Sequence, residues 1–491
     1  MNSILAGIET EYGLMVSGHE APHQIDDAVA FLKACPLPAF AGWNYRYESP
    51  RADLRGFTVQ HLAVDPEDLK FEKPTARERT DAETRSDRVL ENGARFYNDH
   101  GHPEFSTPES WSLDELANFD HAGELCLLRT LGAFQRATGL AAKVYKNNTD
   151  FHGASYGTHE SYLTPRAIGF DRLRDACVPM LVARTILCGA GKVGAEAGDS
   201  ATYQLSQRAD FFSEIASVDT LYRRPLFNTR DEAHADSREW IRLHVIAGDA
   251  NMSTTATKLK VGLIKLSLAL EAAQKTPQWS LADPVTALKR ISRDESLEFA
   301  MELEGGAKTS AYQVIESYLA AAESVLGDDS DLQWTIRTAR SLMDSLRSDQ
   351  AEAARHIDWL AKRRMLEQFM DHADLSWRSP ELQAYDLEYH NIDPVDGLSF
   401  ALAEMGVLER PAELQTFERF LQRGGAGARS FARGLAVSKF AAELKGVCWR
   451  TLTFEVDGEL KEVELLPDQC YEEQLEASSN VEAFINAIGG E

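Results

Sequence analysis

Two short segments alternate side chains of different character at every second position, and this pattern constrains the fold more than any other feature. The segments are GIETEYG and NGARFYND. Because successive side chains of a β-strand point to opposite faces of the sheet, each segment is predicted to be a strand. One face of the first strand would carry Glu9 and Glu11, and one face of the second would carry Arg95, Tyr97 and Asp99.

A half-solvated sheet would explain either segment alone, because such sheets are polar on one face and apolar on the other. The chain contains further clusters of the same polar types, however. They occur in HPEFSTPE, YKNNTD, SYGTHE, QLSQRAD, NTRDEAHAD and RLHVIAGDAN. This repetition of carboxylates, imidazoles and guanidinium groups favours a functional surface over a merely solvated one.

The order of helical and strand patterns predicts an α+β protein. Ser112 can cap a helix that runs to about residue 138, and residues 308–372 have mostly helical apolar spacing. YQLSQRADFF and RLHVIAGDAN are expected to be extended, and RTLTFEVDGELKEVEL is typical of a hairpin that turns at Asp457-Gly458. We expect one large, mostly antiparallel sheet with polar residues on one face and helices on the other, followed by a small C-terminal unit.

Charge and composition exclude several classes of protein. The formal net charge of -26 argues against binding to nucleic acid or to an anionic membrane surface. The first residues lack the basic region of a signal peptide, and no apolar run reaches the roughly 18 residues of a membrane span. The six cysteines show no CxxC spacing, so we expect reduced thiols in a cytoplasmic protein.

The polar clusters have the composition of a site for a metal ion and a phosphate. Carboxylate oxygens suit Mg²⁺ or Mn²⁺, which take phosphate oxygens as further ligands, and arginines bind phosphate through paired donors. No GxxxxGK[ST] motif is present, so a P-loop would not hold the nucleotide. We interpret the weak likeness Gly189-Ala190-Gly191-Lys192 as a turn.

Several of these segments, in the same order, resemble the Pup ligase and Pup deamidase/depupylase family, which is related to glutamine synthetases and carboxylate-amine ligases. The segments are GIETEYG, NGARFYNDHGHPEFSTPE, YKNNTD, GASYGTHESYL, QLSQRAD, NTRDEAHAD and RLHVIAGDAN. The resemblance is strong over residues 4–255 and weak beyond them. It implies a glutamine synthetase-like fold with Mg²⁺ and with ATP as a bound cofactor that need not be turned over. The partners implied are Pup, a small ubiquitin-like protein, and pupylated proteins.

The family has a ligase arm, which joins Pup to substrate lysines, and a hydrolytic arm, which cuts Pup from lysines and deamidates its C-terminal Gln. WNYRYESPRADLRGF, GASYG and the short spacing between Asp99 and HPE resemble the hydrolytic arm. GIETE and KNNTD resemble the ligase arm, and Ser200 stands where an acid would be expected. We predict a depupylase and Pup deamidase. The alternatives are a Pup–protein ligase or another carboxylate-amine ligase, and a catalytically silent Pup-binding protein.

The resemblance also implies roles for individual residues. Asp99 matches the catalytic aspartate, as nucleophile or as base for a water molecule; the competing interpretation is a sheet aspartate paired with Arg95. The Mg²⁺ ligands implied are Glu9, Tyr97 and Glu104, with Glu11, His159 and His244 as further ligands. The nucleotide would be bound by Arg95, Thr107, Arg208, Arg230, Arg242 and Trp449. For the last four residues, ion pairs or plain core packing are the competing interpretations.

We expect a glutamine synthetase-like catalytic domain at residues 1–415, a small C-terminal α/β domain at 416–491, and a monomer. Residues 44–91 are the least regular region, and the charged run at 66–88 is predicted to be a flexible loop. The aromatic residues between 43 and 57 are costly in such a loop. They favour a lid that gates the active site, with an inert insertion as the alternative.

Overall fold

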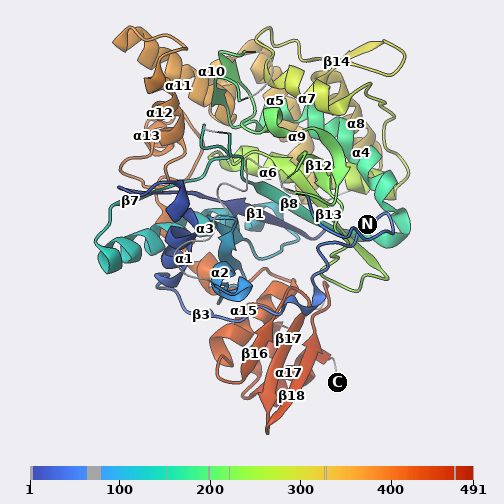
Figure 1. Ribbon diagram of the computed structural model, residues 1–491. Helices are drawn as coiled ribbons and strands as arrows, with labels where there is room; N and C mark the ends of the chain where they lie inside the picture. Colours follow the sequence, from blue (N-terminus) through green and yellow to red (C-terminus); the bar gives the residue numbers. More distant parts are fainter. Residues whose placement is uncertain are drawn as a thin grey trace.

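In the computed structural model, a nine-stranded sheet crosses the middle of the molecule (Figure 1). The structure describes residues 4–63, 79–151, 153–196, 200–220, 222–325, 327, 329–468 and 472–489. The strands lie in the order β11 (Glu214–Ser217), β12 (Pro225–Asn228), β13 (Trp240–Gly248), β8 (Thr158–Pro165), β1 (Ala6–Glu11), β6 (His102–Ser106), β5 (Arg95–Asp99), β4 (Arg88–Leu90) and β3 (Ala39–Phe40). Among the described strand pairs of this sheet, only β11 and β12 run parallel, which confirms the predicted mostly antiparallel sheet.

Helices cover the apolar face of this sheet, as predicted. Ile8, Phe96 and Leu243 point into cores that these helices complete. The helices that lie against the sheet are α1 (Gln24–Lys33), α3 (Leu113–Thr138), α4 (Phe170–Ala183) and α6 (Thr254–Ala272). Behind them, α8 (Ala311–Val325) packs on α4 and α6, and α9 (Ser330–Ser348) packs on α6. α3 begins where its cap predicts, because the Ser112 hydroxyl accepts from the Glu115 amide at 3.5 Å. None of the described helices is both long and apolar enough to cross a membrane.

Smaller elements complete the larger part of the molecule. The helices are α5 (Thr185–Cys188), α7 (Pro284–Ser292), α10 (Gln350–Ala354), α11 (Asp358–Ala373), α12 (Pro380–Tyr389) and α13 (Leu398–Glu404). The paired strands are β2 (Gly13–Val16) with β7 (Ala142–Tyr145), β9 (Lys192–Val193) with β10 (Tyr203–Gln204), and β14 (Ala300–Glu302) with β15 (Lys308–Ser310). Residues 308–372 are thus mostly helical, as predicted.

The extended conformation predicted for YQLSQRADFF is wrong after Gln204. The Ser206 hydroxyl accepts from the amides of Arg208 at 3.1 Å and Ala209 at 3.2 Å. A side chain that bonds the next backbone amides in this way competes with a strand ladder. The chain therefore turns at Ser206 and continues as a short 3₁₀ helix at Ala209–Phe211.

The C-terminal unit at the lower end of Figure 1 has a core of its own. Its strands are β16 (Leu444–Val447), β17 (Thr451–Val456) and β18 (Glu459–Glu464), and its helices are α15 (Arg429–Lys439), α16 (Glu472–Ala477) and α17 (Val481–Gly489). The β17–β18 hairpin turns at Asp457 and Gly458, both with positive φ, as predicted. α14 (Glu418–Gln422) instead contributes Leu421 to the core around α3, and the division at 415/416 stays a prediction.

A buried ion-pair group joins this unit to the sheet. Glu109 follows β6, and its carboxylate accepts from Arg429 Nε at 2.6 Å and from Arg433 Nη1 at 3.1 Å, both on α15. Burial raises the pKa of Glu109, but the two arginines outweigh that effect and lower it to about 2. A second joint is formed by Trp43, which packs edge-on against Trp449 with ring centroids 5.1 Å apart.

The inserted segment, residues 43–91, is partly regular. Residues 64–78, which include most of the predicted flexible loop, lie outside the described residues. For residues 79–88 the loop prediction is wrong, because α2 (Asp81–Arg85) forms there and β4 begins at Arg88. Thr80 and Glu83 form a capping box at the start of α2, which is the physical reason for a helix in this charged run. A gating role for this segment stays a prediction.

Candidate active site

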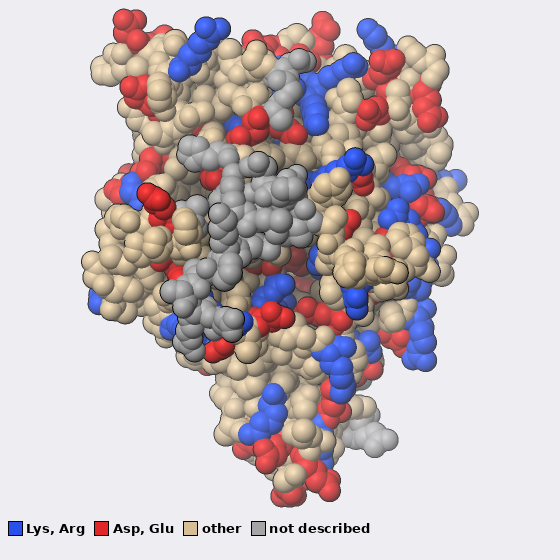
Figure 2. All heavy atoms as spheres, in the orientation of Figure 1, with Lys and Arg blue, Asp and Glu red and all other residues tan. Residues whose placement is uncertain are grey.

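The polar face of the sheet lines a cavity of about 1050 Å³. Strand register brings the predicted residues together on this face: Glu9 lies opposite His159 of β8, and Glu11 lies opposite Glu104 of β6. Glu104 in turn lies opposite Tyr97 of β5. Figure 2 shows acidic and basic side chains gathered in the hollow above the C-terminal unit. The alternation seen in the sequence therefore builds one continuous polar surface.

Glu9, His159 and His244 form the first candidate metal group, with one ligand atom from each residue within 4.8 Å of the others. Glu9 Oε2 lies 3.4 Å from His244 Nε2 and 3.8 Å from His159 Nδ1. Burial raises the pKa of Glu9, but His244, His159 and Arg242 outweigh it and hold the pKa well below its usual value. Burial lowers the pKa of His244 to about 3, so its imidazole is neutral, as a metal ligand must be. Neither ring nitrogen of His244 has a hydrogen-bond partner among the described residues.

Glu11, Asp99 and Glu104 form the second candidate metal group, again with ligand atoms within 4.8 Å of one another. Burial, together with Asp99, Glu9 and Glu11, raises the pKa of Glu104 well above its usual value. Tyr97 donates to Glu104 Oε1 at 2.6 Å, so this predicted ligand contacts the metal group directly. Three carboxylates so close together repel one another, and a divalent cation with hard oxygen preference would remove that repulsion. Both groups thus fit Mg²⁺, and the second group, being all oxygen, fits it better.

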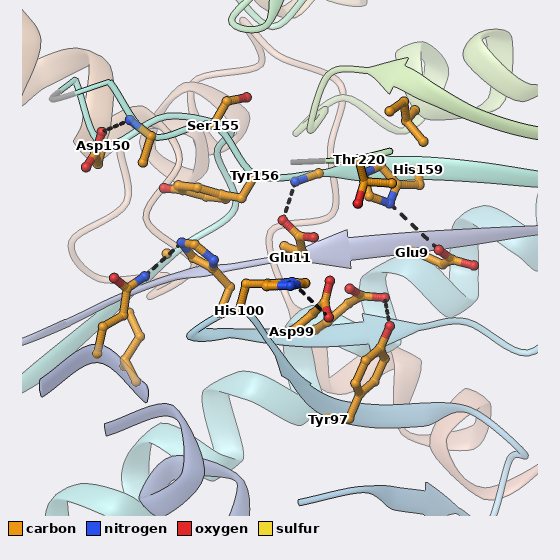
Figure 3. A pocket seen from close by; sticks show the side chains of 18 of the residues that line it. Glu9, Glu11, Tyr97, Asp99, His100, Asp150, Ser155, Tyr156, His159 and Thr220 are labelled. Atoms are coloured by element: carbon orange, nitrogen blue, oxygen red, sulfur yellow. Dashed lines mark hydrogen bonds and ion pairs between the residues drawn. The ribbon is translucent and has the colours of Figure 1, made fainter. Parts of the chain in front are cut away.

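Asp99 lies at the end of β5, and its contacts differ from the alternative considered from sequence. Its Oδ1 accepts from Arg85 Nη1 at 2.7 Å. The same oxygen lies 3.2 Å from His100 Nδ1 (Figure 3). Burial raises the pKa of Asp99, but His100 and Arg85 outweigh it and keep the carboxyl ionised by lowering the pKa. Arg95, the partner expected from strand spacing, pairs with Asp87 instead. The interpretation of Asp99 as a sheet aspartate paired with Arg95 is therefore wrong.

Arg95 is held in place by two aromatic rings and an ion pair. Its guanidinium lies between the rings of Trp43, at 4.1 Å, and Tyr97, at 4.0 Å. Its Nε donates to Asp87 at 2.8 Å, whereas its buried Nη2 has no hydrogen-bond partner among the described residues. A buried donor without a partner is costly, and a phosphate oxygen in the cavity would satisfy it.

The other residues predicted to bind nucleotide divide between two cavities. Arg208, Arg230, Arg242 and Trp449 line the large cavity together with Arg95. Thr107 does not line it: its hydroxyl accepts from the Ile8 amide at 3.0 Å, and it borders a smaller adjoining cavity of about 60 Å³. Trp449 and Arg242 reach both cavities. The Trp449 ring also stacks on His234 with centroids 5.8 Å apart.

Sequence reasoning missed three residues that contact the predicted site. Arg85 was hidden in the charged run, where no pattern distinguished it from a solvated cation. His100 was visible beside Asp99 but had no role, and its left-handed φ of 49° turns its ring back toward the carboxylate. Glu48 accepts from Trp43 Nε1 at 2.7 Å and lies 3.7 Å from Arg95. Contacts of this kind depend on tertiary structure, so residue spacing alone could not reveal them.

The sheet, its helix-covered reverse face and the acid-lined cavity define an enzyme of the glutamine synthetase-like class. Within that class, the chain belongs to the Pup-ligase protein family, whose sequence model matches residues 4–453. The match thus includes the whole nine-stranded sheet and the first part of the C-terminal unit, through α15, β16 and the start of β17.

Two characterised relatives represent different activities. The chain is 36% identical over 470 residues to the depupylase of Acidothermus cellulolyticus, an alignment that covers 92% of this chain and 91% of the relative. It is 39% identical over 342 residues to the Pup–protein ligase of Kineococcus radiotolerans, covering 67% of this chain and 75% of that relative. The depupylase alignment includes nearly the whole chain.

Two solved structures confirm the fold. The complex of Pup with its ligase PafA has a TM-score of 0.78 and 26% identity, and covers 100% of this chain and 93% of that chain. PafA in complex with ADP has a TM-score of 0.72 and 27% identity, and covers 88% of this chain and 95% of that chain.

Proposed function

We propose that this chain is a depupylase and Pup deamidase: it hydrolyses the isopeptide bond between Pup and substrate lysines and converts the C-terminal Gln of Pup to Glu. The observation that carries the proposal is the position of Asp99, an ionised carboxylate that lies with Glu11 and Glu104 in a large cavity, which a second candidate metal group also lines. The nearly full-length similarity to a depupylase supports hydrolysis over ligation.

The residues that would hold Mg²⁺ are Glu9, His159 and His244 of the first group and Glu11 and Glu104 of the second, with Tyr97 beside Glu104. Two observations support this assignment: the ring nitrogens of His244 accept or donate no hydrogen bond among the described residues, and the pKa of Glu104 is raised. When bound, Mg²⁺ would neutralise the carboxylates and polarise the carbonyl of the scissile amide.

ATP would bind as a standing cofactor on the same face. Arg95 offers its free Nη2 to a phosphate, and Arg242 has a buried Nε without a hydrogen-bond partner among the described residues. Trp449 offers a ring at the junction of the two cavities, where a base could stack. The structural relative PafA has been solved in complex with ADP, and this supports a nucleotide site here.

Asp99 supplies the carboxylate that takes part in the reaction. It either attacks the amide carbon or takes a proton from a water molecule that does so. In both cases water is consumed, the C–N bond breaks, and the departing nitrogen takes up a proton. The products are a carboxylate on Pup and either a lysine amine or ammonia.

Pup is the proposed partner, since a structural relative is a complex with Pup. The test is an incubation with Mg²⁺, ATP and a Pup–lysine protein conjugate, followed by gel analysis and phosphate release. We expect free Pup to appear without stoichiometric ATP consumption. Conjugation of Pup ending in Glu with one ATP consumed per bond would instead establish a ligase, and binding without turnover would establish a silent Pup-binding protein.

A further inference from the structure

The short helix α2 is held on one side by strand β5 and on the other by helix α1. Its cap closes through Thr80 and Glu83, and the Thr84 carbonyl accepts from Asn98 Nδ2 of β5 at 3.1 Å. The chain leaves α2 through Ser86, whose backbone is left-handed and whose hydroxyl donates to the Glu83 carbonyl at 2.7 Å. Arg79, just before the cap, pairs with Asp26 of α1. The last helical residue, Arg85, is therefore delivered to a fixed place beside β5.

Arg85 reaches the carboxylate of Asp99 from that place. Its Nη1 donates to Oδ1 at 2.7 Å, and its guanidinium carbon lies 5.9 Å from the centre of the Tyr97 ring. His100 contacts the same oxygen of Asp99, at 3.2 Å. Both of these contacts are made to Oδ1. A carboxylate turns freely about its last bond, and such a contact on one oxygen selects its orientation.

We propose that Arg85 is a positioning residue for the reaction, which fixes the orientation of the Asp99 carboxylate toward the scissile amide. This inference rests on the proposed function and adds a residue that the inserted segment contributes to the site. The side chain of Arg85 is 37% exposed, so it is not a core residue on which folding depends. Its contact with a reactive group is the feature that distinguishes it from an ordinary surface ion pair, which contributes little.

The test compares Arg85→Gln and Arg85→Lys with the wild type in the conjugate-cleavage assay. Arg51→Gln is the matched control: it makes the same substitution in the same segment, where Arg51 contacts only the Gln60 carbonyl among the described residues. We expect Arg85→Gln to lower kcat by about 10- to 100-fold, because misplacing a reacting group by about 1 Å has an effect of that order. KM for the conjugate and Kd for Mg·ADP should stay within about twofold.

Arg85→Lys keeps a donor and a charge but loses the rigid fork of the guanidinium. It should therefore recover part of kcat, to within about tenfold of the wild type. Arg51→Gln should match the wild type in kcat, and melting temperatures should show that all three variants are folded. The recovery by lysine is the result that a purely structural role would not produce.

Three results would overturn the inference. In one, Arg85→Gln retains kcat within about twofold; in another, KM rises while kcat is unchanged, which would make Arg85 a substrate contact. In the third, lysine gives no recovery although the variant is folded. If the wild type itself leaves the conjugate intact, the proposed function fails and this inference falls with it.

Discussion

Glu104 and Glu109 lie five residues apart, both are buried, and they have opposite electrostatic surroundings. Glu104 faces Asp99, Glu9 and Glu11, and with burial these neighbours raise its pKa. Glu109 faces Arg429 and Arg433, which lower its pKa to about 2 against the opposing effect of burial. Two buried glutamates thus have different neighbours: like charges surround Glu104, and opposite charges surround Glu109.

This difference distinguishes a ligand-binding site, around Glu104, from a structural contact between the sheet and the C-terminal unit, around Glu109. The charges around Glu109 are balanced within the chain, so the group stabilises the contact between the sheet and the C-terminal unit. Glu104 forms no ion pair with a cation among the described residues, so a bound cation is needed to offset the repulsion from its acidic neighbours. Uncompensated buried charge in a cavity is the more informative sign of function.

Asp99→Asn should have the largest effect, because it removes the reactive carboxylate on the Glu104 side of the comparison. We expect kcat for conjugate cleavage and deamidation to fall by about 1000-fold, within the range of a lost acid–base or nucleophilic group. Nucleotide binding, measured by calorimetry with Mg·ADP, should be largely retained. Full activity in this variant would refute the proposed role of Asp99.

Glu109→Gln should be the most destabilising change, because it leaves two buried arginines without their partner. We expect a loss of about 3–5 kcal/mol in the free energy of unfolding, measured by urea denaturation. Glu104→Gln is the matched control at the site and, without Mg²⁺, should be neutral or stabilising, since it relieves repulsion. Equal destabilisation of the two variants would remove the distinction between site and joint.

Mg²⁺ should stabilise the wild type, because a bound cation would offset the repulsion between the carboxylates of the candidate metal groups. At about 100 times its Kd, a bound ion raises the free energy of unfolding by about 2.7 kcal/mol. Chelation should reverse this gain, which a thermal melt with and without Mg²⁺ would show. Glu109→Gln should retain the gain and Glu104→Gln should lose most of it. An unchanged gain in Glu104→Gln would place the ion elsewhere.

Acid should weaken the Glu109 joint by a smaller amount. Its folded pKa of about 2 is below the usual 4.5, so its stabilising contribution is present above pH 4.5 and is lost as the pH falls toward 2. Between pH 5 and 3.5 the loss should be about 1 kcal/mol. The difference in unfolding free energy between wild type and Glu109→Gln should shrink by that amount over this range. A difference that stays constant would mean that the pKa of Glu109 is not lowered.

Sequence pattern predicted the parts of the molecule that depend on local chemistry. The alternation in β1 and β5 gave the shared faces of Glu9, Glu11, Tyr97 and Asp99, because strand period is a property of the backbone. The capping residue Ser112 predicted the start of α3, and Asp457-Gly458 predicted the turn of the C-terminal hairpin. Thr107 shows the limit: adjacent to the polar strand, it bonds the Ile8 amide instead of facing the large cavity.

The rest required contacts between distant segments. Arg85 meets Asp99 only because α2 docks on β5, and Arg95 is stacked by Trp43 only because residue 43 lies beside the C-terminal sheet. No periodic pattern or fixed spacing in the sequence predicts where such an arginine will lie. The capping box at Thr80 is a local signal for α2. It lies in a charged run whose composition is typical of a solvated loop, and the loop was therefore predicted instead.

The two-residue side-chain period of β1 also limits which sequence changes this enzyme can tolerate during evolution. An insertion of a single residue between Glu9 and Glu11 would move one of them to the side where Ile8 and Tyr12 are packed, and would place an apolar side chain among the acids. Length changes should therefore accumulate in the connections between strands, such as the long one between β3 and β4. The strands that carry the acids can vary by substitution but not by length.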